Sequence, residues 1–189
     1  WAFADKYTGF SGPAGLMFFN QLVKDGEAGE LDLVLRDAFR VPRDIDEAVR
    51  LIERLTSYSN ELRTRGSGLA AARSPFFVSW FWWAQDPSWI PMWPRAEKGL
   101  AKLGWIPSSN DDNGERYRNY WILSTTVAED PAEAHYVWSW LGRKEAQFGL
   151  DPTHIKRCVA VGKLDSARRD EGSPSWVEGR ESISACLTD

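Results

Sequence analysis

The stretch SPFFVSWFWWAQDPSWIPMWPRAEKGLAKLGW, residues 74–105, is the part of the sequence that decides the fold. It contains six of the chain's 11 tryptophans, which are Trp80, Trp82, Trp83, Trp89, Trp93 and Trp105. Tryptophan combines a large apolar ring system with an N–H donor, so this density is typical of a compact core or a recognition surface. The stretch therefore bears on both the fold and the function.

Proline and glycine divide this stretch into a helix, a turn and a second helix. The Ser-Pro pair at 74–75 is typical of an N-cap followed by the first helical position. The Asp-Pro pair at 86–87 ends this helix, because proline disfavours helical geometry in the residue before it. Pro94 then begins the second helix, and Gly104 closes it.

Apolar residues at three- and four-residue spacing predict further helices on both sides of this unit. The longest begins at Asp44, which forms a capping-box-like pair with Glu47, and ends at Gly66. In the helix over 12–24, we expect one buried face formed by Leu16, Phe19, Leu22 and Val23. The expected helices cover residues 12–24, 30–39, 44–65, 117–130, 131–149 and a segment that begins at the Asp-Pro pair 151–152.

The expected fold class is mainly α, an irregular multi-helix bundle over residues 1–162. Residues 157–164, RCVAVGKL, are the best strand candidate and compete with a helix. From 163 to 189 the composition turns polar, which indicates a tail that is flexible, carries a minor β element or begins a following region. Because the chain starts at Trp1 and stops in a polar stretch, we expect a fragment of a longer protein.

Composition excludes several classes of protein. A net charge of −4 and a pI near 5.3 argue against a broad nucleic-acid or anionic-membrane surface. Cys158 and Cys186 lack metal-site spacing, and two thiols make no secreted disulfide framework, so a cytoplasmic location is expected. No apolar run reaches the roughly 18 residues of a membrane span.

Motifs for catalysis are missing from the sequence. It has no Walker A motif, no GxSxG elbow, and no HExxH around His135 or His154. Adjacent acidic residues at 111–112 and 129–130 are typical of solvated charge and helix caps. We therefore expect no enzyme, no cofactor and no metal, with a metal-dependent nuclease built from scattered carboxylates as the remaining catalytic alternative.

The tryptophans and arginines supply the candidate binding site. We expect Trp80 and Trp83 to point into the core, Trp82 to be either core or surface, and Trp89, Ile90 and Trp93 to be partly exposed. Tryptophan can stack on a ligand, and arginine can pair with phosphate or carboxylate. The alternative without a binding role is that the arginines lie on solvated helix faces and that the tryptophans of the turn pack it onto the bundle. The candidate binding residues are Trp89, Trp93, Arg73, Arg95, Arg116 and Arg118.

Three segments resemble the N-terminal region that precedes the AAA+ motor in some McrB-like bacterial ATPases. They are GFSGPAGLMFFNQLV at 9–23, the stretch at 74–105, and AEAHYVWSWL at 132–141. The resemblance spans about residues 9–150, and its motifs are structural, so no functional residue transfers. It implies a restriction or antiphage setting and a nucleotide-dependent AAA+ motor in the same longer chain. The family's β-rich modules that read modified DNA do not match this helical sequence.

These observations predict a non-catalytic recognition or interaction domain that binds nucleic acid or a phage or partner protein. On this hypothesis, Trp89→Ala weakens binding and leaves the fold intact. The alternative is an oligomerisation or docking module for the motor, which would meet a copy of itself or the neighbouring domain.

Overall fold

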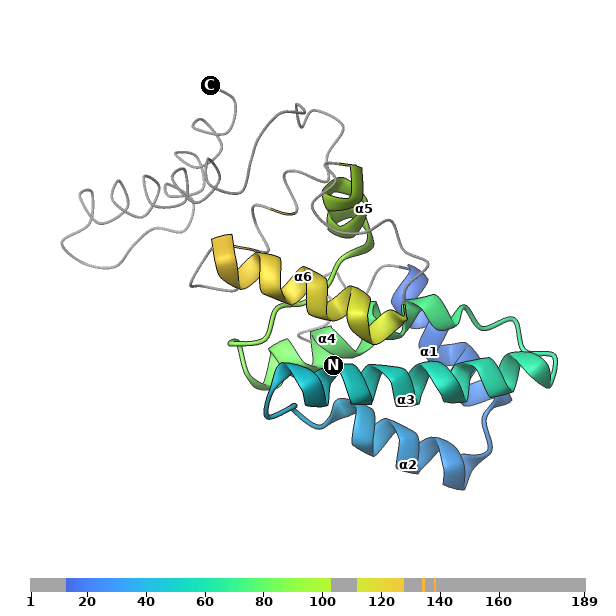
Figure 1. The fold of residues 1–189 in the computed structure, drawn as a ribbon. Helices are drawn as coiled ribbons and strands as arrows, with labels where there is room; N and C mark the ends of the chain where they lie inside the picture. The colour runs from blue at the N-terminus through green and yellow to red at the C-terminus, as the bar shows by residue number, and fades with distance from the viewer. Residues whose placement is uncertain (1–12, 103–111, 128–133, 135–137, 139–189) are drawn as a thin grey trace. The chain divides into compact units, whose positions relative to one another are not determined.

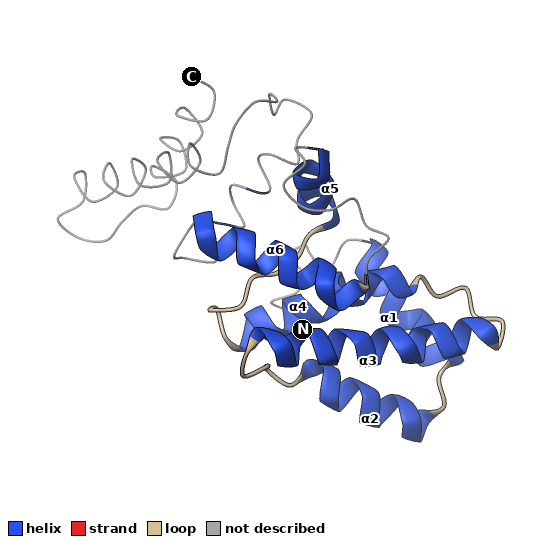
Figure 2. Cartoon of the chain, viewed as in Figure 1, coloured by secondary structure: helices blue, strands red, loops and turns tan. Residues whose placement is uncertain are grey.

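The computed structural model describes residues 13–102 and 112–127, together with Ala134 and Trp138 (Figure 1). This part is mainly α, as predicted, and contains no strand (Figure 2). The expected helices beyond residue 130, the closing Gly104 and the polar tail lie outside the described residues. The helices are α1 Pro13–Asp25, α2 Ala28–Phe39, α3 Ile45–Thr64, α4 Ser74–Gln85, α5 Pro94–Lys102 and α6 Asn113–Val127, with a short 3-10 turn, η1, at Ala71–Arg73.

The chain divides into two compact units. One comprises Trp1–Trp93 with Ser109–Tyr120, and the other Pro94–Ser108 with Trp121–Asp189. Helices α1 to α4 and the first part of α6 belong to the first unit, which contains most of the tryptophan-rich stretch. Helix α5 and the end of α6 belong to the second, and the expected boundary at residue 162 lies outside the described residues.

Helix α3 is the longest helix of the first unit and packs against α2, η1 and α4. The Asp44 side chain accepts a 2.7 Å hydrogen bond from the Glu47 amide, which confirms the predicted N-cap. At the other end, Gly66 has a φ of 99°, and its amide donates to Arg63 O while Ser67 N donates to Leu62 O. This is a Schellman ending, so the predicted stop at Gly66 is confirmed.

The side chain of Glu47 binds the residues that precede the cap. Its buried carboxylate accepts hydrogen bonds from the Arg43 amide at 2.8 Å, the Arg43 side chain at 2.9 Å and the Arg40 guanidinium at 2.7 Å. The Arg43 side chain and backbone, followed by Arg40, lower the Glu47 pKa to about 2. The carboxylate therefore fixes the loop between α2 and α3.

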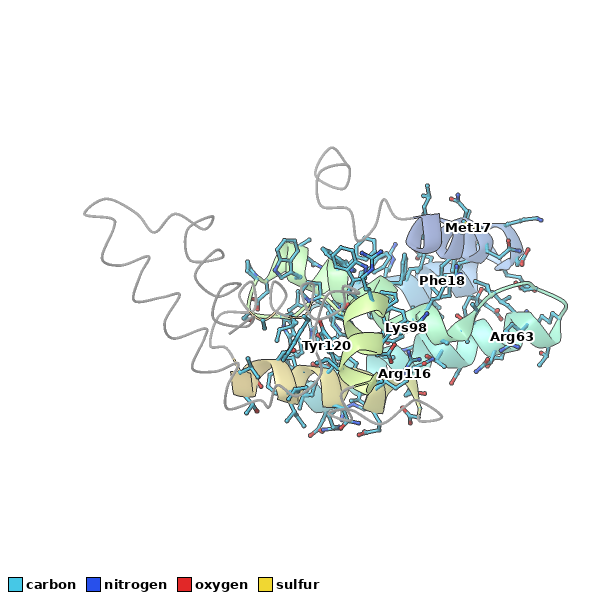
Figure 3. The ribbon with its side chains drawn as sticks, turned by 90° about the horizontal axis from the view of Figure 1, so that it is seen from above. Met17, Phe18, Arg63, Lys98, Arg116 and Tyr120 are labelled. Carbon is cyan, nitrogen blue, oxygen red and sulfur yellow. The ribbon has the colours of Figure 1, made fainter. Side chains whose placement is uncertain are left out.

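The buried face of α1 differs from the prediction. Phe18 and Leu22 are buried, whereas Leu16 and Val23 are 47% and 53% exposed (Figure 3 labels Phe18). Helix α1 carries apolar residues around much of its circumference, so the spacing fits more than one face. The contact that sets its rotation is Phe18 against Phe77 of α4, edge to face at 5.3 Å between ring centroids.

Candidate recognition surface

The inner face of α4 is set by Trp82, which is fully buried. Its ring packs edge to face against the rings of Trp89 and Tyr117, with ring centroids 5.8 Å and 5.5 Å apart. Its Nε1 donates a hydrogen bond to Ala38 O at 2.8 Å. The expectation that Trp80 and Trp83 point into the core is wrong, because both are partly exposed. The core position belongs to Trp82.

A second inner face of α4 packs against α2. Phe81 stacks on Phe39 with ring centroids 4.0 Å apart, and the Gln85 amide donates to the Phe39 carbonyl at 2.7 Å. Phe77 meets Phe39 as well, at 5.6 Å. Trp82 and Phe77 are buried, and Phe81, although partly exposed, is covered on one side by Phe39. The face of α4 that carries Phe76, Trp80 and Trp83 points away from α2.

The Pro-rich turn after α4 folds back onto the core, as the alternative of turn packing predicted. Trp89 is only 7% exposed and Ile90 is fully buried. The Ser79 hydroxyl accepts a 2.9 Å hydrogen bond from Met92 N, and the Tyr117 hydroxyl donates to Ile90 O at 3.0 Å. The predicted partial exposure of Trp89 and Ile90 is therefore wrong, because polar groups of α4 and α6 hold the turn inward.

The outer face of α4 carries a line of aromatic side chains. Phe76, Trp80 and Trp83 are spaced four and three residues apart, so they share one face of the helix, and all three are partly exposed. Trp93 is partly exposed, as predicted. Its ring packs edge to face against Trp80 with centroids 6.2 Å apart, and Trp80 packs edge to face against Trp83 with centroids 5.7 Å apart. We call Phe76, Trp80, Trp83 and Trp93 the aromatic stripe.

Arg116 lies at the Phe76 end of the aromatic stripe. Its guanidinium carbon is 5.5 Å from the centre of the Phe76 ring, a cation–π distance, and Nη1 donates to Asn113 Oδ1 at 2.7 Å (Figure 3 labels Arg116). The Asn113 amide in turn donates to Thr56 Oγ1 at 3.0 Å and Ala71 O at 2.9 Å. This network joins α6 to α3 and η1 and so positions Arg116.

The other predicted arginines lie in different surroundings. Arg73, the last residue of η1, is partly exposed three positions before Phe76, near the same end of the stripe. Arg118 donates to Asp46 at 2.6 Å and to Glu115 at 3.0 Å, and the hydrogen bond to Asp46 is the main cause that raises its pKa. Arg95 is exposed on α5, in the second unit.

The six predicted binding residues therefore do not gather as one set in the described first unit. Trp93, Arg73 and Arg116 belong to the stripe or its end, Trp89 lies beneath the surface, and Arg118 is bound by carboxylates of α3 and α6. The prediction omitted Phe76, Trp80 and Trp83 as binding residues. Their i, i+4, i+7 spacing is visible in the sequence, but that spacing gives no sign of which face of α4 is outside.

Comparison with protein-family models, curated proteins and solved structures finds no match for this chain. In the described ranges, no three histidine, cysteine, aspartate or glutamate side chains gather as metal ligands. None of the described helices has the length and apolar character needed to cross a membrane. The aromatic stripe with its arginines is thus the feature on which a function can be argued.

Proposed function

We propose that this chain is a non-catalytic recognition domain that binds a protein partner through the aromatic stripe. The observation that carries the proposal is the alignment of Phe76, Trp80 and Trp83 on the outer face of α4, extended by Trp93 and ending at Arg116. Tryptophan and arginine are enriched among the few residues that supply most of the binding energy at protein interfaces.

The stripe is held in place before any partner arrives. Trp82 and Phe81 fasten the inner faces of α4 to α2, and the outer indoles contact one another edge to face. Binding to side chains that are already ordered costs less conformational entropy than binding to mobile ones. This supports a recognition role for a surface made of rigid rings.

The net charge of the chain favours a protein partner over nucleic acid. Affinity for a phosphate backbone depends on many cations that neutralise phosphates, and the chain has a net charge of −4. Many of its arginines contact carboxylates of the same chain. Those that do so include Arg36, Arg40, Arg43, Arg54, Arg65 and Arg118. The indoles suit apolar side chains of a partner segment, and the positive charges of Arg73 and Arg116 suit a carboxylate on that segment.

The resemblance to N-terminal regions of McrB-like ATPases supports the same class of function. In that setting the partner is a phage protein or another component of a bacterial defence system. The domain would then present the bound partner to an AAA+ motor in the same longer chain.

A docking or oligomerisation role is the second candidate, and one observation favours it. Helix α1 exposes three apolar side chains, Leu16, Met17 and Val23, at 47%, 62% and 53% (Figure 3 labels Met17). Leu16 and Val23 are seven residues apart and so lie on the same side of the helix. Exposed apolar patches mark interaction sites. Sedimentation of the chain and of its Met17→Asp variant tests this role, since a self-associating chain becomes monomeric in the variant.

A peptide display library panned on the full chain tests the proposed function. We expect selected peptides to carry aromatic or aliphatic residues together with an aspartate or glutamate. Trp83→Ala lowers the affinity of such a peptide about tenfold, because loss of one dominant contact costs about 1–2 kcal/mol. Fluorescence anisotropy with a labelled peptide gives the affinity.

The matched control is Leu33→Ala, which removes another exposed apolar side chain, on α2, and should leave peptide affinity unchanged. Equal losses in both variants would contradict the proposal. A different outcome would be tight, salt-sensitive binding of a single-stranded oligonucleotide that is lost in the Trp83→Ala variant. That result would show that the aromatic stripe binds nucleic acid and not a protein.

A further inference from the structure

Two carboxyl groups converge on one backbone amide where α6 meets α3. The amide of Gly114 donates to Glu53 Oε1 of α3 at 2.5 Å and to Asp112 Oδ1 at 2.9 Å. Glu53 and Asp112 are 59 positions apart in sequence, and neither takes part in the aromatic stripe. Two carboxylates that face the same donor repel each other when both are ionised, so such pairs retain a proton.

We propose that Glu53 and Asp112 share one proton and so form a pH-sensitive latch that holds the first turn of α6 on α3. The protonated Glu53 carboxyl donates to the Asp112 carboxylate while its other oxygen accepts from Gly114. When the proton leaves, the two charges repel and the contact weakens. This inference does not depend on the proposed function.

The surrounding charges support a proton on Glu53. Burial first, and then the hydrogen bond to Asp112, raise the Glu53 pKa to about 7, whereas the bond from Glu53 lowers the pKa of Asp112. Glu115, on α6, adds negative charge and raises the Glu53 pKa further. Arg118 lies near Asp112 but already bonds to Glu115 and to Asp46 of α3.

The latch sits at a close approach between α3 and α6. A Cβ added at Gly114 would lie 2.7 Å from Val49 Cγ1 and 2.9 Å from Val49 O, so only glycine lets the helices come this near. The same turn of α6 carries Arg116, which rests on Phe76, and Tyr117, which bonds to Ile90 O. Opening the latch would therefore loosen the arginine end of the aromatic stripe.

Amide NMR of the full chain across the pH range of carboxylate and histidine titration tests the latch. We expect the Gly114 resonance to titrate with a midpoint near 7, the value of the Glu53 pKa. Glu53→Gln abolishes this titration, and Asp112→Asn returns the midpoint toward the ordinary glutamate range. Glu61→Gln, at an exposed position of the same helix, leaves the midpoint unchanged.

Each variant can overturn the inference. A Gly114 midpoint in the ordinary carboxylate range would show that Glu53 holds no shared proton. The same midpoint in wild type and Glu53→Gln would assign the titration to another group. An unchanged midpoint in Asp112→Asn would exclude Asp112 as the partner, and this variant changes an exposed residue outside the helices.

Discussion

The indole Nε1 of Trp82 donates a 2.8 Å hydrogen bond to the carbonyl oxygen of Ala38, 44 residues earlier in the chain. Ala38 lies in the last turn of α2, where helix carbonyls have no partner within the helix. The bond therefore satisfies an otherwise orphaned acceptor and fixes the rotation of α4 about its axis. With Trp82 inside, Phe76, Trp80 and Trp83 lie on the partly exposed face of α4.

Trp82→Phe should destabilise the fold by about 2–4 kcal/mol, because it leaves the buried Ala38 carbonyl without its donor and removes core volume. Urea unfolding measures this loss. Trp80→Phe, on the partly exposed face of the same helix, should cost clearly less. An equal loss of unfolding free energy in the two variants would mean that the hydrogen bond from Trp82 to Ala38 O does not add to stability.

Trp89→Ala should act on stability rather than on recognition. Trp89 is 7% exposed and packs against Trp82, so its removal leaves a cavity that costs about 3–5 kcal/mol. Thermal unfolding should show a large drop in midpoint. A variant as stable as wild type that bound the selected peptide less well would instead restore Trp89 as a binding residue.

Two glycines in the second position of a helix should respond in opposite ways to alanine. Gly114→Ala in α6 places a Cβ 2.7 Å from Val49 Cγ1 and should destabilise by about 1–3 kcal/mol. Gly29→Ala in α2 meets nothing within 4 Å and should stabilise by about 0.5–1 kcal/mol. Urea midpoints of the two variants should fall on either side of wild type, and a shift in the same direction would contradict the close helix approach.

Glu47 should make the fold sensitive to acid. Its pKa is lowered from 4.5 to about 2 in the fold, so its stabilising effect is complete above about 4.5 and is lost as the pH falls toward 2. Glu47→Gln should therefore lower the melting temperature at pH 7, with a gap to wild type that closes in acid. Asp32→Asn, in an exposed pair with Arg36, should change little. A gap that does not vary with pH would rule out the charge as the cause.

Several helix ends could be predicted from the sequence because they depend on neighbouring residues. Asp44 caps α3 by bonding an amide three positions later, and Gly66 ends it through its own positive φ. Proline at 87 and 94 acts equally locally, and α4 and α5 end and begin beside these prolines. The mainly α fold class followed from these local signals.

Two predicted helix starts are wrong. Ser74 is the first residue of α4 and not its N-cap, because its hydroxyl donates to Ala71 O at 2.8 Å. Helix α6 begins at Asn113, four residues before the predicted start.

The orientation of the aromatic residues could not be predicted in this way. Helix α4 is apolar nearly all round, so its pattern does not distinguish an inner from an outer face. The distinction between Trp82 and Trp83 is set by Ala38, and the burial of Trp89 depends on the turn being held by Ser79 and Tyr117. Such contacts join distant parts of the chain and leave no mark in local spacing.

The most direct test of the recognition surface is the ¹⁵N–¹H spectrum of the tryptophan indoles, recorded with and without a display-selected peptide. Each of the 11 tryptophans contributes one indole signal. We expect the peptide to shift the signals of Trp80, Trp83 and Trp93 and to leave those of the buried Trp82 and Trp89 in place. Unchanged signals for Trp80, Trp83 and Trp93 on saturation with peptide would contradict a binding role for the aromatic stripe.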